Sequence, residues 1–307
     1  MTPEEYMQIA IEEAKKGSGF TSPNPLVGAV LVKDGKIVGK DYHHKYGEFH
    51  AERNAILNCK EDLAGASLYV TLEPCCHYGK TPPCTQIIIE KGIKKVYIGS
   101  YDPNPKVNGG GIKQLKDAGI EVVTEVLKEE CDALNPVFFH YIEKKEPYVV
   151  LKYAMTADGK IATRTGASKW ITGEAARKRV QYSRKIYSGI MVGIGTVLAD
   201  DPMLTCRLEN AQNPVRIICD SSLRIPLDSN IVKTAKEVPT IIACTVAKED
   251  KGNLKKDLTI KEKIETLQQA GCEVLPIGRT KTGVDLKELM KLLGEKGIDS
   301  ILLEGGS

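Results

Sequence analysis

The sequence predicts an α/β protein with two domains, and three observations support this. The chain has 307 residues, more than the roughly 100–200 residues of a typical single domain. Apolar residues make up 42% and charged residues 27% of it, as in folded globular chains. Helical and strand patterns alternate along both halves, which favours sheets covered by helices on both faces. A new strand follows Glu146-Pro147, so we place the domains at 1–145 and 146–307.

The first half begins with a helix and a hairpin. Thr2, Pro3 and Glu5 form a capping-box helix start. Apolar runs then flank Asp34-Gly35, which is a strong signal for a two-residue β-turn. The later elements expected here are helices at 50–59, 84–91 and 112–119, strands at 67–72 and 95–100, and a helical stretch at 125–145. This order predicts an α/β sandwich with a mixed sheet.

The second half repeats short apolar strands and longer helical patterns. The expected strands are 148–154, 189–195, 215–220, 240–245, 272–278 and 300–306, and the expected helices are 174–186, 261–271 and 286–297. Apolar strands that alternate with helices predict a mainly parallel sheet covered on both sides.

Composition excludes several classes of function. The net charge is only +3 and the lysines are scattered, so a nucleic-acid partner has little electrostatic support. No apolar run approaches the ~18 residues that span a bilayer. The chain starts with an acidic amphipathic helix instead of a signal peptide. Nine cysteines in such a chain favour reduced thiols. We therefore expect a cytoplasmic protein without membrane segments.

One group of residues predicts a catalytic zinc site. His50, Cys75 and Cys84 offer an imidazole and two thiolates, which suit tetrahedral Zn²⁺ and leave its fourth position for water. Each cysteine precedes an expected helix start, where the helix dipole favours a thiolate. Glu52 lies two residues after His50, so the two side chains do not face each other on a helix. Glu52 is therefore free to carry protons, as in zinc deaminases.

The cysteine spacing departs from the general deaminase pattern. That pattern has two residues between the cysteines, whereas eight separate Cys75 from Cys84. From the residues alone, Cys76 and His77 stay open as rival ligands.

Longer segments of the chain resemble a known family. TSPNPLVGAVLV, HAERNA, TLEPCCHYGKTPPC and DPNPKVNGGGI resemble the bifunctional riboflavin-biosynthesis deaminase/reductases, as do LKYAMTADGKIAT, SKWITG, GIGTVLADDPMLTCR and LLEGGS in the second half. The resemblance implies a cytidine-deaminase-like α/β/α sandwich followed by a reductase domain like dihydrofolate reductase. It also implies that Cys75 and Cys84 bind the metal and that Cys76 does not.

The resemblance implies two reactions. In the first, zinc-bound hydroxide deaminates 2,5-diamino-6-(5-phosphoribosylamino)pyrimidin-4-one, and Glu52 carries the proton from water to the leaving ammonia. In the second, NADPH reduces the ribosyl group to ribityl. The implied deaminase substrate contacts are Asn24, His43, Lys80, Asp102 and Asn104. On the residues alone, Lys80 is equally compatible with a solvated loop lysine, and 102–105 with a plain turn.

The second site is less distinct in the sequence. Positions at the carboxyl ends of the expected strands suit a ligand, and Gly305 and Gly306 would let a cofactor phosphate approach the backbone. By resemblance, the cofactor contacts are Ala154, Trp170, Thr196, Asp200 and Ser221, and the substrate contacts are Ser168, Arg184, Leu204, Arg207 and Glu304. Arg184 and Arg207 suit a bidentate phosphate contact, and Lys152 is a candidate catalytic residue for opening the ribosylamine.

Three other interpretations stay open at this stage. They are a single-function zinc deaminase with an inactive or regulatory second domain, a zinc-containing binding module, and a nucleic-acid editor. The family also continues beyond a segment like LLEGGS, so we expect the reductase domain to be incomplete at its carboxyl end. We expect the protein to act on a small phosphorylated pyrimidine and to form a homo-oligomer, either a dimer or a tetramer.

Overall fold

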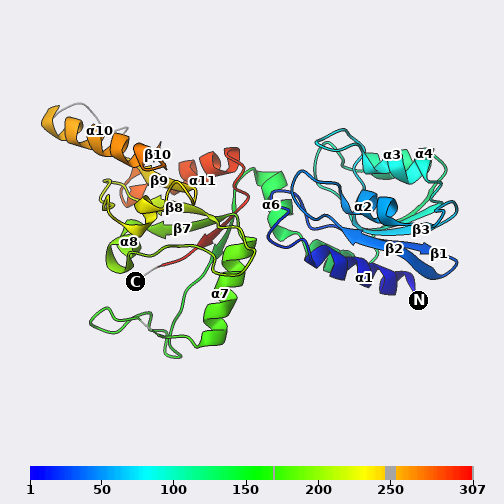
Figure 1. Cartoon of the computed structure of the whole chain (residues 1–307), viewed down its shortest axis with the longest axis horizontal. Coiled ribbons are helices and arrows are strands. Elements are labelled where there is room, and N and C mark those ends of the chain that lie inside the picture. The colour runs from blue at the N-terminus through cyan, green and yellow to red at the C-terminus, as the bar shows by residue number, and fades with distance from the viewer. Residues whose placement is uncertain (169, 246–253, 306–307) are drawn as a thin grey trace. The chain divides into compact units, whose positions relative to one another are not determined.

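The computed structural model describes residues 1–168, 170–245 and 254–305. The chain divides into two compact units, Met1–Lys144 and Lys145–Ser307 (Figure 1). Each unit builds its own sheet. Among the described residues, no helix combines the length and the apolar character that crossing a bilayer requires.

The first unit is built on a five-stranded mixed sheet with the order β2-β1-β3-β4-β5. Strands β1 and β2 form the expected hairpin, β1 also pairs antiparallel with β3, and β3, β4 and β5 run parallel. The strands are β1 (Gly28–Lys33), β2 (Lys36–Tyr42), β3 (Ser67–Leu72), β4 (Lys95–Ser100) and β5 (Glu121–Val123). The helices are α1 (Pro3–Lys15), α2 (Ala51–Asn58), α3 (Cys84–Glu90), α4 (Gly110–Asp117), α5 (Lys128–Asp132) and α6 (Pro136–Lys144).

Alternation along β1 shows how this sheet buries both faces. Ala29 and Leu31 join the core under α2, α3 and α4, whereas Val30 and Val32 join the core under α1. Figure 1 shows these helices on opposite sides of the sheet. Successive side chains of a strand point to opposite faces, so a strand covered by helices on both sides is apolar throughout. The predicted α/β sandwich is confirmed.

Local sequence signals explain how this unit begins. The Thr2 hydroxyl accepts the Glu5 N–H at 3.3 Å, and the Glu5 carboxylate accepts the Thr2 N–H at 2.8 Å. This is the predicted capping box. Asp34 and Gly35 both have positive φ, 49° and 74°, as a tight hairpin turn requires.

The predicted helical stretch at 125–145 is wrong as one element, because it is broken between α5 and α6. Asn135 lies in the break and is buried. Its side chain accepts the Leu26 N–H at 2.7 Å and donates to the Leu26 carbonyl at 2.9 Å. Pro136, which has no N–H, then starts α6 at a position where none is needed. A long-range contact therefore overrides the helical pattern.

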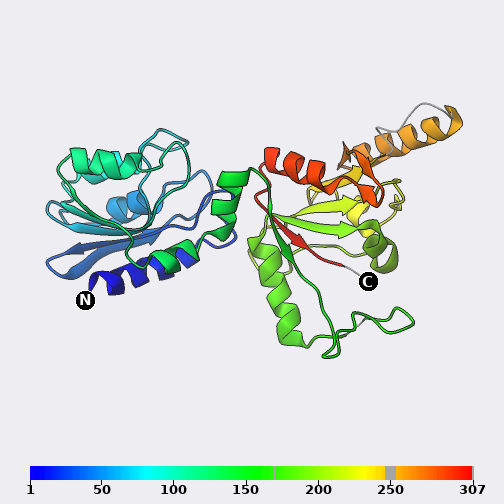
Figure 2. The same cartoon turned by 180° about the vertical axis from the view of Figure 1, so that it is seen from behind.

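The second unit contains a six-stranded parallel sheet with the order β10-β9-β8-β7-β13-β6. Figure 2 shows β13, near the red end of the chain, beside the green segment that contains β6. The strands are β6 (Tyr148–Leu151), β7 (Gly189–Gly193), β8 (Val215–Cys219), β9 (Thr240–Cys244), β10 (Cys272–Pro276), β13 (Ser300–Leu303) and the separate pair β11 (Arg279–Thr280) and β12 (Gly283–Val284). The helices are α7 (Glu174–Ile186), α8 (Ile194–Asp200), α9 (Asn230–Lys233), α10 (Leu254–Gln269) and α11 (Leu286–Glu295).

This sheet also has a core on each face. Ile190 and Val192 of β7 pack with α8, α9 and α10, and Met191 packs with α11. The predicted parallel α/β arrangement is confirmed. The carboxyl ends of β6, β7 and β13 meet at one edge of the sheet, where ligands bind in open α/β folds.

Candidate active sites

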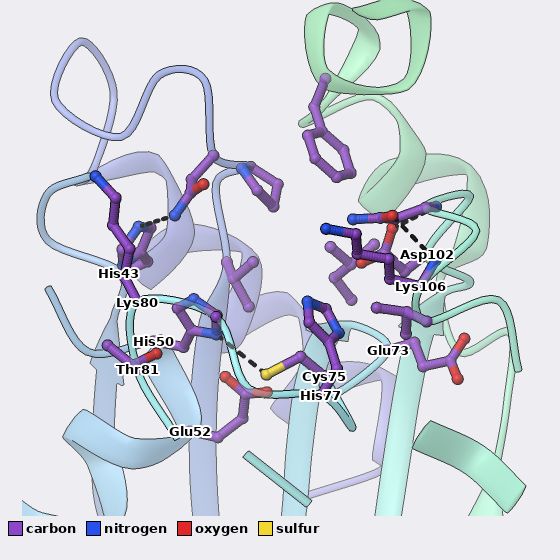
Figure 3. Close-up of a pocket in the computed structure, with 18 of the residues that line it drawn as sticks. His43, His50, Glu52, Glu73, Cys75, His77, Lys80, Thr81, Asp102 and Lys106 are labelled. Atoms are coloured by element: carbon purple, nitrogen blue, oxygen red, sulfur yellow. Dashed lines mark hydrogen bonds between the residues drawn. The ribbon is translucent and has the colours of Figure 1, made fainter. Parts of the chain in front are cut away.

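His50, Cys75 and Cys84 come together at one end of the first unit. Each offers one ligand atom, and the three atoms lie within 4.8 Å of one another. The Nδ1 atom of His50 is 3.5 Å from each cysteine Sγ. Figure 3 shows His50 and Cys75 side by side at the floor of a pocket. One imidazole and two thiolates within this radius fit Zn²⁺, whose ligands in proteins are of these types.

The backbone places each ligand differently. His50 is the N-cap residue of α2, with an extended ψ of 165°, and Cys84 is the first residue of α3. Cys75 lies in the loop after β3, and no helix begins directly after it. The expectation that both cysteines precede helix starts is therefore wrong for Cys75. The eight residues between the two cysteines form the loop that brings Cys75 back to α3.

The residues of the cluster change one another's pKa values. The pKa of Cys75 is lowered to about 4, chiefly because the Cys84 thiol hydrogen-bonds to it and His50 lies beside it, and burial opposes this. Burial lowers the pKa of His50, but the bond to Cys75 and the charge of Glu52 outweigh burial and raise it. The lowered pKa of Cys75 favours its thiolate, which is the form that binds metals.

Glu52 lies beside the cluster without belonging to it. It is the second residue of α2 and only 3% of its surface is exposed. Burial raises its pKa to about 7. Figure 3 shows its carboxylate directed toward His50 and Cys75. Glu52 thus lies beside the ligand group and outside it, and its role as a proton carrier stays a prediction.

The two rival ligands lie outside the cluster. The Sγ atom of Cys76 is 3.8 Å from the Lys106 carbonyl oxygen, and His77 lines the pocket. The buried Nδ1 atom of His77 has no hydrogen-bond partner among the described residues. Over the described ranges, only His50, Cys75 and Cys84 form a metal-ligand group.

The pocket above the cluster has a volume of about 370 Å³, within the usual range for small-molecule sites. All five residues predicted to contact the deaminase substrate line it, namely Asn24, His43, Lys80, Asp102 and Asn104. Their roles as substrate contacts stay predictions.

His43 and Asn24 form one wall of this pocket. His43 is buried, and burial lowers its pKa below the usual value. Its Nδ1 atom donates to the Phe49 carbonyl at 3.0 Å, and its Nε2 atom accepts from the Asn24 amide at 3.1 Å. This pairing requires a neutral imidazole with the proton on Nδ1. It leaves the Asn24 side-chain oxygen available to a ligand.

Asp102 and Asn104 form the opposite wall. Their side-chain oxygens accept the N–H groups of Asn104 and Lys106, at 2.8 and 3.1 Å, so the segment is also the Asx-type turn that its sequence suggests. Burial is the main cause that raises the pKa of Asp102 to about 6. A turn held by its own side chains is a rigid support for a binding wall.

Sequence reasoning missed Glu73 and Lys106, which also line the pocket. The buried Glu73 carboxylate accepts the N–H groups of Gly109 and Ile112 at the start of α4, both at 3.1 Å. It therefore ties the end of β3 to the loop that carries Asp102. A glutamate directly before Pro74-Cys75 was the available signal, but its partner lies 36 residues away.

The second pocket lies in the second unit and has a volume of about 840 Å³. Most of the predicted reductase residues line it, namely Lys152, Ala154, Ser168, Trp170, Arg184, Thr196, Asp200, Leu204, Arg207, Glu304 and Gly305. Ser221 is not among its lining residues, and Gly306 lies outside the described residues. The roles of all these residues stay predictions.

An ion-pair group lies in this pocket. Arg184 donates to Glu304 from Nε at 2.9 Å and from Nη2 at 3.0 Å, and its Nη1 donates to the Thr205 carbonyl at 2.9 Å. Lys152 Nζ is 3.9 Å from the same carboxylate. Each Arg184 nitrogen thus already has a protein partner, whereas Arg207 is an exposed residue that lines the pocket.

One glycine allows the backbone to approach closely where a dinucleotide would bind. Gly305 has a φ of +99°, and a Cβ atom there would lie 2.7 Å from Thr196 Oγ1. Only glycine therefore fits between the end of β13 and α8. Backbone amides exposed in this way suit a cofactor phosphate. The pocket's volume and its mixture of apolar, hydroxyl and basic side chains agree with this, so the site fits NADPH.

Comparisons with known proteins agree with both sites. Residues 1–100 match the family model of the cytidine and deoxycytidylate deaminase zinc-binding region, and residues 147–307 match that of the RibD C-terminal domain. The riboflavin biosynthesis protein RibD of Actinobacillus pleuropneumoniae is 60% identical over 307 residues, covering 100% of this chain and 78% of that protein. RibD of Aquifex aeolicus is 46% identical, covering 98% and 80%.

Solved structures give the same result. The diaminohydroxyphosphoribosylaminopyrimidine deaminase/5-amino-6-(5-phosphoribosylamino)uracil reductase of Thermotoga maritima superposes with a TM-score of 0.85 at 43% identity, covering 99% of this chain and 81% of that chain. RibD of Acinetobacter baumannii gives a TM-score of 0.84 at 37% identity, covering 99% and 81%. The predicted resemblance is confirmed, and with it zinc and NADPH as the cofactors. The chain belongs to the RibD family of bifunctional deaminase/reductases of riboflavin biosynthesis.

Proposed function

We propose that the first pocket deaminates 2,5-diamino-6-(5-phosphoribosylamino)pyrimidin-4-one and that the second reduces the resulting ribosylaminouracil phosphate to its ribityl form. The observation that carries this proposal is the group of His50, Cys75 and Cys84, with buried Glu52 beside it. Three ligands suit a catalytic zinc site, because a structural site normally has four. The Thermotoga maritima relative is named for the same two activities.

The deaminase step needs a proton carrier and a rigid binding wall. His50, Cys75 and Cys84 would hold Zn²⁺, which would supply a water with a pKa lowered to about 7. Glu52 would be the proton carrier, taking a proton from the attacking water and giving one to the leaving amine, which would depart as ammonia. Asn24 and Asp102 hold the pyrimidine ring from opposite walls, and His43 fixes the orientation of Asn24. Water and substrate thus give ammonia and a uracil-type product.

In the reductase step the ribosyl ring must open, and the ribosyl carbon that receives the hydride must be held in place. Thr196 and Gly305 line the pocket that would hold NADPH, and the cofactor would supply a hydride. We assign opening of the ribosylamine ring to Lys152, and its position in the pocket, 3.9 Å from Glu304, supports this assignment. Arg207 is available to the substrate phosphate as a bidentate donor. Arg184 holds Glu304 and the loop around Leu204 in place.

A two-stage assay tests this proposal. The purified chain, with zinc retained, receives the diaminopyrimidinone ribosylamine phosphate, and ammonia release is measured. NADPH is then added and its oxidation is followed. Ammonia release followed by NADPH oxidation supports both halves. Ammonia release alone supports the single-function deaminase, and zinc without ammonia release would support the binding-module interpretation.

Location and assembly belong to the same proposal. A cytoplasmic location is supported by the cysteine usage, and a homodimer or homotetramer by the frequency of symmetric assembly among enzymes. Sedimentation of the purified chain measures the assembly directly.

A further inference from the structure

The mouth of the first pocket carries two lysines on different loops. Lys80 belongs to the loop between β3 and α3, and Lys106 to the loop between β4 and α4. In Figure 3, Lys106 points toward the middle of the pocket, whereas Lys80 runs up the facing wall. The metal-ligand group lies below both. The two ammonium groups are therefore placed for a ligand group that extends away from the pocket floor.

The two lysines differ in their partners. The Lys80 ammonium group lies 3.9 Å from the centre of the Tyr46 ring, which is a favourable cation–π contact. The Lys106 ammonium group has no hydrogen bond or ion pair within the described part of the chain. Its backbone is held, however, because its N–H donates to Asn104 at 3.1 Å. Lys106 thus offers an uncompensated charge from a fixed position.

The other possible anion receptor of this pocket is already occupied. The start of α4 would attract an anion, but Gly109 and Ile112 donate their N–H groups to the carboxylate of Glu73. That carboxylate repels a second anion at the same place. A phosphate group in this pocket must therefore find its positive partner among the side chains at the mouth.

We infer that Lys106 binds the phosphate group of the deaminase substrate and sets the preference for phosphorylated over dephosphorylated ribosylaminopyrimidine. The inference rests on the proposed function, which supplies the phosphate. The reacting ring carbon must lie near His50 and Cys75 at the floor, so the ribose phosphate extends toward the mouth. An ammonium–phosphate contact is a charge-assisted hydrogen bond, and losing one typically weakens binding by roughly tenfold to a hundredfold.

The test compares each variant on the phosphorylated substrate and on the same compound after phosphatase treatment. We expect Lys106→Met to lower the ratio of the two kcat/KM values by roughly tenfold or more, and Lys106→Arg to keep most of it. Lys116→Met is the matched control, since Lys116 is an exposed lysine of α4 outside the pocket. It should leave the ratio unchanged.

A binding measurement makes the test independent of turnover. Calorimetry compares Glu52→Gln with the double variant Glu52→Gln/Lys106→Met, and the double variant should bind the phosphorylated compound more weakly by the same factor. The inference would be overturned if Lys106→Met kept the preference for the phosphorylated compound. It would also be overturned if Lys80→Met lost that preference while Lys106→Met kept it. If the wild type releases no ammonia from either compound, the proposed function fails, and calorimetry still decides the role of Lys106. If neither compound binds, both ideas are wrong.

Discussion

Arg184 and Glu304 form a two-point ion pair across 120 residues of sequence, with N–O distances of 2.9 and 3.0 Å. Arg184 lies in the last turn of α7, and Glu304 follows β13. The third Arg184 nitrogen holds the Thr205 carbonyl, next to Leu204, whose φ is +52°. One guanidinium group therefore fixes a helix, a strand end and a strained loop around the second pocket.

Removing one partner of this pair should destabilise the second unit. Both side chains are largely buried, with 14% and 9% exposed, so Arg184→Met leaves the Glu304 carboxylate with only the distant Lys152 ammonium group, at 3.9 Å, as an ionic partner. We expect a loss of about 3 kcal/mol in the free energy of unfolding, measured by urea denaturation. The double variant Arg184→Met/Glu304→Gln should recover part of that loss, because the buried carboxylate that lost its two-point partner is then gone. Strictly additive losses would show that the pair is not coupled.

Glu52→Gln should separate catalysis from metal binding. Glutamine keeps the shape of the side chain but cannot carry the proton, so deamination should fall by roughly a thousandfold or more. Zinc content, measured by atomic absorption, should stay at the wild-type level because Glu52 lies outside the ligand group. Loss of zinc in this variant would show that Glu52 is a ligand.

Substitution of the adjacent cysteines Cys75 and Cys76 should have different effects on zinc content and ammonia release. Cys75→Ser removes a ligand, so we expect loss of zinc and of ammonia release. Cys76→Ser changes only a thiol that faces the Lys106 carbonyl oxygen, and should retain both. The metal content of the two variants, purified in parallel, checks this. Equal loss in both would restore Cys76 as a ligand.

Asp102→Asn should stabilise the fold in a pH-dependent manner. Burial raises the pKa of Asp102 from 3.8 to about 6, so its ionised form costs stability above that pH, and the cost vanishes as the group is protonated. Asparagine still accepts the Asn104 N–H. We expect the variant to exceed the wild type by up to about 3 kcal/mol near pH 8 and to match it near pH 4. Denaturation at the two pH values measures this, and an equal difference at both would refute it.

Strong local signals predicted most of the fold. The capping box at Thr2, the turn at Asp34-Gly35 and the apolar strands depend on near neighbours. The structure also contains β5, α8, α9 and the β11–β12 pair, which were not expected. These elements are short, so periodicity has few residues in which to appear.

The residues of the candidate sites likewise fall into two groups, those that the sequence pattern predicted and those that it did not. His50, Glu52, Cys75 and Cys84 were found because their residue types and order are distinctive. The partners of Glu73 and Arg184 were not, since hydrogen bonds between segments 36 and 120 residues apart leave no local pattern. Ser221 was expected at the second pocket but does not line it.

The metal-ligand group and the second pocket share no residue and lie in different units. On the proposed assignment, zinc starvation would halt the hydrolytic reaction and leave the reductase half intact but without its substrate. In a cell short of zinc, the reductase would thus stop oxidising NADPH without any separate regulatory signal. Zinc supply would set how much NADPH the second reaction consumes.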